Sequence, residues 1–142
     1  MQPALFDTSI YITSLRRGSE TALALRRVTA DAPLWLSAVV LEELYAGAGS
    51  GERRAVERLE RDFDMVKRIL VPNLSDWILT GRVLARLAAK YGYEQIGQGR
   101  LTNDALIAMS ARRLGIRVLT ANERDYRRLA EFHAFPWAVI SL

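Results

Sequence analysis

This sequence contains no cysteine and a single histidine, His133. The absence of cysteine excludes a disulfide framework and is typical of a reducing compartment, so we expect a cytoplasmic protein. A structural zinc site and Cys–His catalysis both need residues that the chain lacks. A Ser–His–Asp triad would depend on His133, which we expect to be a structural residue. Carboxylates are therefore the side chains left for catalysis.

Long hydrophobic runs are missing as well. No apolar run reaches the roughly 18 residues that a membrane span needs, and the first residues do not resemble a secretory signal. The net charge is +4 and arginine supplies most of the basic groups. Arginine suits phosphate contacts, but the five Arg–Arg pairs, such as Arg53–Arg54, are most simply interpreted as solvated helix faces. Charge alone is compatible with a nucleic-acid partner without indicating one.

Short apolar segments alternate with helical patterns along the chain. The length fits one domain, which we expect to cover residues 1–142. Strands that alternate with helices predict an α/β fold with a central, mostly parallel sheet of about five short strands flanked by helices on both faces. We expect strands at residues 3–6, 34–36, 70–71, 117–120 and 138–141, and helices after the first strand, at 19–30, 37–45, 52–69, 75–91 and 100–114, and from 123.

Polar side chains follow three of the expected strands. Asp7 comes directly after the first strand, Ser37 after the second, and Asn122 shortly after the fourth. Ligands of parallel sheets bind beyond the carboxyl ends of the strands, so these positions are candidates for a site. The same residue types also cap helices at such junctions, so this signal is weak by itself.

Asp104 is an acid within an otherwise apolar helix stripe. Its spacing places it on one face with Leu101, Ile107 and Ala108. A buried carboxylate without a partner costs several kcal/mol, so this position predicts a partner or a function. Alternatively, Asp104 lies in the first helical turn and interacts with the positive end of the helix dipole. The residues alone leave both interpretations open.

Two further pairs of polar residues are ambiguous. Glu42 and Glu43 are adjacent in a helix and point about 100° apart, so one of them at most faces a site, and periodicity does not separate them. Asn122 and Asp125 have the spacing of a variant capping box, although either could also contact a metal or a water molecule.

Several acids at one place repel each other and raise each other's pKa. A hard divalent cation such as Mg²⁺ or Mn²⁺ resolves that conflict, since it prefers oxygen ligands and often binds beside substrate phosphates. Such a cation can activate water for an in-line displacement at phosphorus. The acids and the basic composition together favour phosphodiester cleavage.

Three blocks of the chain resemble a known family. They are LFDTSIYI at residues 5–12, LSAVVLEELYAGA at 36–48, and TNDALIAMSARRLGIRVLTANERDY at 102–126. In this order and spacing they are similar to the PIN-domain ribonucleases, particularly the VapC toxins of bacterial toxin–antitoxin pairs. The resemblance spans nearly the whole chain.

The resemblance also implies roles for individual residues. The metal-holding acids fall on Asp7, Glu43 rather than Glu42, and Asp104, and a hydroxyl of Thr8 or Ser9 assists them. The family's fourth position, an aspartate or an asparagine, falls on Asn122. An asparagine here carries one negative charge fewer than an aspartate would and leaves the number of metal ions open. Asp125 matches the aspartate that commonly follows, and Tyr126 stands where phenylalanine is usual.

The activity implied by the resemblance is a Mg²⁺- or Mn²⁺-dependent endoribonuclease that acts as the toxin of a toxin–antitoxin pair. It further implies a homodimer and inhibition by a VapB-like antitoxin whose C-terminal segment lies over the acids. The alternative is a catalytically weak relative that binds RNA or a partner without cutting. Four residues of the early helices are candidate partner contacts, although core packing is the simpler interpretation of each: Tyr11, Ile12, Leu15 and Tyr45.

Overall fold

The computed structural model of this chain describes residues 2–17, 32–96 and 100–141. Its strands form one five-stranded sheet in the order β3-β2-β1-β4-β5, and each neighbouring pair is parallel. The predicted α/β fold with a parallel sheet of five short strands is therefore confirmed. The strands are β1 (Ala4–Phe6), β2 (Leu34–Ser37), β3 (Ile69–Leu70), β4 (Arg117–Thr120) and β5 (Trp137–Val139).

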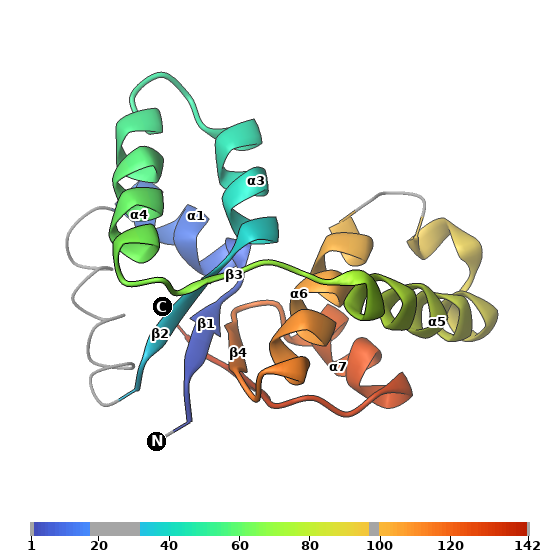
Figure 1. The fold of residues 1–142 in the computed structure, drawn as a ribbon. Helices are drawn as coiled ribbons and strands as arrows, with labels where there is room; N and C mark the ends of the chain where they lie inside the picture. Colours follow the sequence, from blue (N-terminus) through green and yellow to red (C-terminus); the bar gives the residue numbers. More distant parts are fainter. Residues whose placement is uncertain (1, 18–31, 97–99, 142) are drawn as a thin grey trace.

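The helices flank the sheet in two groups. Figure 1 shows α1, α3 and α4 gathered on one side of the strands and α5, α6 and α7 on the other. The predicted helix at residues 19–30 lies outside the described residues. None of the described helices is long and apolar enough to cross a membrane. The helices are α1 (Thr8–Arg17), α3 (Ala38–Gly47), α4 (Arg53–Met65), α5 (Leu74–Tyr91), α6 (Arg100–Arg113) and α7 (Glu123–Phe132), with a short 3₁₀ helix at Tyr93–Gln95.

Local sequence signals set several of these boundaries. The Ser37 hydroxyl accepts a hydrogen bond from the Val39 backbone N–H (3.2 Å) and caps α3, as its position predicted. Gly115 ends α6 in the left-handed region, at φ 67°, where glycine carries no steric penalty.

Several predicted boundaries are shifted by one or more residues, and strand pairing explains two of these differences. The helix expected to run to residue 69 ends at Met65, because the chain must turn before Ile69 in order to pair with Leu36. The last strand covers Trp137–Val139 rather than residues 138–141, because its register with β4 is set by the pairing of Trp137 with Val118.

The centre of the sheet is buried on both faces. All three residues of β1 are at most 2% exposed, as expected for an inner strand of a parallel sheet. The chain proceeds from β1 to β2 and β3 on one side, while β4 and β5 lie on the other side. The direction of strand order therefore reverses between β1 and β4. Ligands of open α/β sheets bind in the crevice outside the carboxyl ends of the strands at such a reversal.

Candidate active site

A cavity of about 280 Å³ opens at this reversal point. Four parts of the chain that are distant in sequence supply its wall: the end of β1 with α1, and then α3, α6 and the segment after β4. We call this cavity the acid pocket, because three of its side chains are carboxylates. Its lining residues are Asp7, Thr8, Ser9, Ile12, Glu43, Asp104 and Asn122.

Asp7 is the most deeply buried of the three pocket carboxylates, at 2% exposure. The Ser9 hydroxyl donates a hydrogen bond to its Oδ1 atom (2.5 Å), and the Thr120 hydroxyl donates one to Oδ2 (2.6 Å). Burial nevertheless raises the pKa of Asp7 above its usual value, against the lowering effect of these hydrogen bonds. The charged carboxylate is thus only partly compensated by its own surroundings.

Thr120 is a site residue whose contact with Asp7 was not predicted from the sequence. Its hydroxyl donates to Asp7 and accepts a hydrogen bond from the Asn122 backbone N–H (2.9 Å). The signal that could have revealed it is the sheet register, in which Phe6 pairs with Leu119. Asp7 and Thr120 each follow one of these partners, so they reach the same edge of the sheet together.

Glu43 and Glu42 have clearly different surroundings. The Glu43 carboxylate lines the acid pocket and accepts a hydrogen bond from the Thr8 hydroxyl (2.6 Å). Glu42, its neighbour in α3, is exposed to solvent. The structure thus brings together with Asp7 the glutamate that the family resemblance indicated, a choice that helical periodicity left open.

Asp104 lies on the buried face of α6, where it is 6% exposed. Leu101, Ile107 and Ala108, which share its stripe, are buried too. The first turn of α6 contains no acidic residue, so Asp104 is not a first-turn acid stabilised by the helix dipole. Its carboxylate instead lines the acid pocket with those of Asp7 and Glu43.

Asn122 and Asp125 form the capping pair that their spacing predicted. Asn122 is the N-cap of α7, and its Oδ1 atom accepts a hydrogen bond from the Asp125 backbone N–H (3.4 Å). The Asn122 side-chain amide in turn donates to the Asp125 carboxylate (2.9 Å). Asn122 lines the acid pocket, whereas Asp125 is not among the lining residues and is hydrogen-bonded to Asn122.

The polar side chains of the pocket offer oxygen atoms as metal ligands. The one amide nitrogen among them, on Asn122, donates a hydrogen bond to the Asp125 carboxylate. Carboxylate, hydroxyl and amide oxygens are the ligands that Mg²⁺ and Mn²⁺ prefer, so the donor set fits a hard divalent cation. Within residues 2–17, 32–96 and 100–141, no three acid, imidazole or thiol groups already lie close enough together to hold an ion. Instead, the Thr8 hydroxyl donates a hydrogen bond to Glu43, and the hydroxyls of Ser9 and Thr120 donate hydrogen bonds to Asp7.

The sequence model of the PIN domain matches residues 4–132. This match covers the whole sheet apart from β5 and all of the residues that line the acid pocket. The chain belongs to the PIN-domain family.

Solved structures support the fold of this PIN domain, while no curated protein matches its sequence. A DNA-bound VapBC complex from Salmonella typhimurium has a TM-score of 0.70 at 22% identity, with 98% of both chains covered. A VapBC complex from Rickettsia felis bound to a promoter DNA fragment has a TM-score of 0.67 at 17% identity, covering 97% of this chain and 98% of that one. A VapBC complex from nontypeable Haemophilus influenzae has a TM-score of 0.63 at 25% identity, with 96% of both chains covered.

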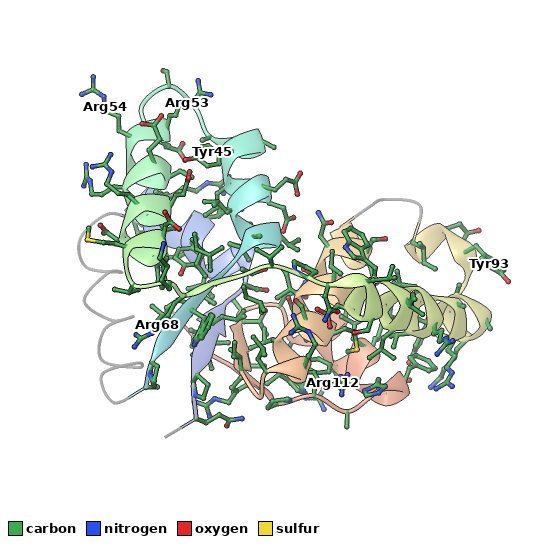
Figure 2. The ribbon with its side chains drawn as sticks, viewed as in Figure 1. Tyr45, Arg53, Arg54, Arg68, Tyr93 and Arg112 are labelled. Atoms are coloured by element: carbon green, nitrogen blue, oxygen red, sulfur yellow. The ribbon has the colours of Figure 1, made fainter. Side chains whose placement is uncertain are left out.

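Basic side chains of this PIN domain occur in both helix groups. Figure 2 shows Arg53 and Arg54 projecting from the beginning of α4, while Arg112 lies on α6 in the other helix group. Arg53 and Arg54 are exposed, which agrees with their interpretation as a solvated helix face, and Arg53 pairs with Glu57 (3.9 Å) in the next turn.

Proposed function

We propose that this PIN domain is a Mg²⁺- or Mn²⁺-dependent endoribonuclease that acts as the toxin of a toxin–antitoxin pair. The observation that carries the proposal is the convergence of Asp7, Glu43 and Asp104 on one cavity at the reversal point of a PIN fold. Each of these three carboxylates would have a lower free energy if it were solvated separately at the surface. Their meeting in one cavity is therefore better explained by a function than by a structural role.

In this proposal the three carboxylates hold the metal, and the hydroxyls around them set their orientations. Ser9 and Thr120 each bond one oxygen of Asp7, so the carboxylate plane has little rotational freedom. The Thr8 hydroxyl donates to one oxygen of Glu43. A bound divalent cation would polarise the scissile phosphodiester and lower the pKa of attacking water. Asn122 would line the site with its side chain held in place by two hydrogen bonds to Asp125.

The proposed homodimer is supported by exposed apolar side chains at the beginning of α5. The later part of this helix packs into the protein through Val83, Leu84 and Leu87. Leu74, Trp77 and Ile78 lie at its N-terminal end and are 75%, 55% and 47% exposed. Exposed apolar patches of this kind mark interaction sites. By contrast, Tyr11 is buried, and Tyr45 packs against the core and donates its hydroxyl to Glu60 (2.5 Å), so core packing accounts for both.

The proposed inhibitor is a VapB-like antitoxin that covers the acid pocket. The structural neighbours are VapBC complexes, which supports a partner of this class. Covering the pocket with a basic segment would compensate its carboxylates as a cation does. We expect co-expression with the cognate antitoxin to yield a stable complex that does not cut RNA, and gel filtration with an RNA-cleavage assay would test this.

The deciding experiment is RNA cleavage by purified, antitoxin-free protein in Mg²⁺, in Mn²⁺ and in EDTA. The substrates are a panel of structured and single-stranded RNAs. Asp7→Asn tests the site, and Glu42→Gln, which removes an exposed acid of the same helix group, is the matched control. Cutting that needs metal, survives in Glu42→Gln and is lost in Asp7→Asn supports the proposal. If the wild type binds RNA but neither binds metal nor cuts any RNA, the binding-only alternative replaces it.

A further inference from the structure

Helices α5 and α7 each carry a row of basic side chains. In α5, Arg82, Arg86 and Lys90 follow one another at a spacing of four residues, and all three are exposed. In α7, Arg124 and Arg128 have the same spacing. Residues four apart lie on one face of a helix, about 6 Å from each other along its axis. Each row therefore places like charges next to one another.

Contacts between the two helices join the rows into one surface. Figure 1 shows α7 beside α5 in the same helix group, and the two helices are in contact. The Arg128 guanidinium group lies 4.4 Å from the ring centroid of Tyr91 at the end of α5, and the Lys90 ammonium group lies 5.1 Å from it. The Nη1 atom of Arg86 donates a hydrogen bond to the carbonyl of Phe132, the last residue of α7 (3.4 Å). We call the five side chains of the two rows the basic surface: Arg82, Arg86, Lys90, Arg124 and Arg128.

The charges of the basic surface are less balanced than those of α4. Arg53 at the beginning of α4 pairs with Glu57 one turn later, whereas α5 contains no acidic residue after the buried Asp76. Glu131 accepts a hydrogen bond from Lys90 where the helices meet (2.8 Å), so it compensates one of the five positive charges. Like charges four residues apart destabilise a helix. The rows therefore carry a cost in the free protein that an anionic partner would remove.

The basic surface begins beside the acid pocket. Asn122 lines the pocket and caps α7, and Arg124 follows it by two residues with an exposed side chain. Arg128 lies one turn further along α7, where it meets Tyr91 of α5. None of the ion pairs formed within residues 2–17, 32–96 and 100–141 includes Arg82 or Arg124. Positive groups thus lead from the pocket along α7 to α5.

We infer that the basic surface binds the sugar–phosphate backbone of an RNA strand whose scissile bond lies in the acid pocket. The inference rests on the proposed function, which makes RNA the polyanion that reaches this pocket. Arginine suits the contact because its planar guanidinium group donates two parallel hydrogen bonds to a phosphate. Backbone contacts position a strand without reading its bases. The basic surface therefore holds RNA of any sequence while the pocket acts on one phosphodiester.

Solvated helix faces without a partner are the competing explanation, and α4 supplies the matched control. The double variant Arg82→Gln/Arg124→Gln removes one exposed positive charge from each row and leaves the contacts that join the helices in place. The control, Arg53→Gln/Arg54→Gln, removes the same charge from exposed side chains of the other helix group, which are labelled in Figure 2. A general effect of net charge would weaken RNA binding equally in both double variants.

The test is binding of a labelled single-stranded RNA of about 16 nucleotides, measured by fluorescence anisotropy in EDTA at several salt concentrations. The proposed cleavage needs a divalent cation, so the RNA stays intact. We expect Arg82→Gln/Arg124→Gln to raise the Kd by about tenfold and to lower the slope of log Kd against log salt by about 1.4, because each phosphate contact to a single strand contributes about 0.7. The control, Arg53→Gln/Arg54→Gln, should keep the Kd within about twofold of the wild type.

The possible outcomes separate the inference from the proposed function. Equal losses in the two double variants, or no loss in either, would overturn the inference and leave the proposed function in place. An acidic segment of a protein partner is the other ligand of matching charge, and poly-glutamate is its probe. Tighter binding of poly-glutamate than of RNA would overturn the assignment to RNA. A wild type that binds RNA through these arginines but never cuts it in Mg²⁺ or Mn²⁺ would overturn the proposed nuclease activity and leave RNA binding at this surface standing.

Discussion

The protein buries two aspartates in very different ways. Asp76, at the start of α5, is 1% exposed, and the Arg113 Nε–H donates to both of its oxygens (3.1 and 3.0 Å). Its Oδ2 atom also accepts from the Asn73 backbone N–H (3.0 Å), which completes a capping box. Asp7 is equally buried, yet its side-chain partners are two neutral hydroxyls, and among the described ion pairs it has none.

This contrast separates a structural carboxylate from a candidate functional one. Asp76 receives a cation from its own chain, so its charge is compensated in the folded protein. The raised pKa of Asp7 indicates that its charge is not fully compensated. A buried acid that the fold orients but does not neutralise is suited to an external cation.

The largest expected effect is on cleavage by Asp7→Asn. The amide keeps the shape of the carboxylate but carries no charge, so we expect RNA cleavage to fall by about 1000-fold, in line with the several kcal/mol that a bound metal supplies. Asp76→Asn should leave cleavage unchanged in whatever fraction of the protein remains folded. Initial rates normalised to folded protein measure both. Equal losses in the two variants would remove the distinction between these aspartates.

The second effect is on stability, at Arg113. Replacing Arg113 by Met leaves the Asp76 carboxylate buried without its cation, and we expect the free energy of unfolding to fall by about 3 kcal/mol. Urea denaturation measures this loss. The exposed pair of Arg127 with Glu123 is the control, since Arg127→Met should change stability by less than about 1 kcal/mol. Similar values for the two arginines would show that the Asp76 pair contributes no more than a surface pair.

The third effect is a dependence of the free energy of unfolding on pH, which is caused by Asp7. Because its pKa is raised on folding, the folded protein binds this proton more tightly than the unfolded chain does. The destabilisation by Asp7 is therefore absent below the ordinary pKa of 3.8 and develops as the pH rises from there through the raised folded pKa. In EDTA, Asp7→Asn should be more stable than the wild type at neutral pH, and this advantage should shrink as the solution is acidified. Chemical denaturation of both proteins at several pH values tests the sign, which a constant difference would contradict.

The smallest expected effect is at Glu42. This exposed side chain neighbours Glu43 in sequence but has no place in the acid pocket, so Glu42→Gln should change cleavage by less than about twofold and stability by less than about 0.5 kcal/mol. Glu43→Gln should lose cleavage strongly, because this carboxylate lines the pocket. Measuring the RNA-cleavage rates of both variants side by side tests this expectation. A strong loss of cleavage in Glu42→Gln would move the site to a different face of α3.

The sequence by itself determined the α/β fold class and the order of its strands and helices along the chain. Apolar segments such as Ala4–Phe6 favour inner strands, and capping residues such as Ser37 and Asn122 act within a few residues of their position. These are local properties, so a single stretch of chain is enough to reveal them. The strand and helix limits that were wrong, near residues 66–69 and 137–141, depend on pairing with distant strands.

Only the tertiary structure decided which polar groups meet. Periodicity could not choose between Glu42 and Glu43, and the local capping box that includes Asp76 does not show that Arg113 pairs with it. The contact of Thr120 with Asp7 joins residues 113 positions apart, and it exists because β1 and β4 pair in one register. Charge compensation likewise depends on which residue faces which across the fold. Asp76 meets Arg113, whereas Asp7 meets two hydroxyls in a pocket shared with Glu43 and Asp104, and that difference arises only when the elements pack.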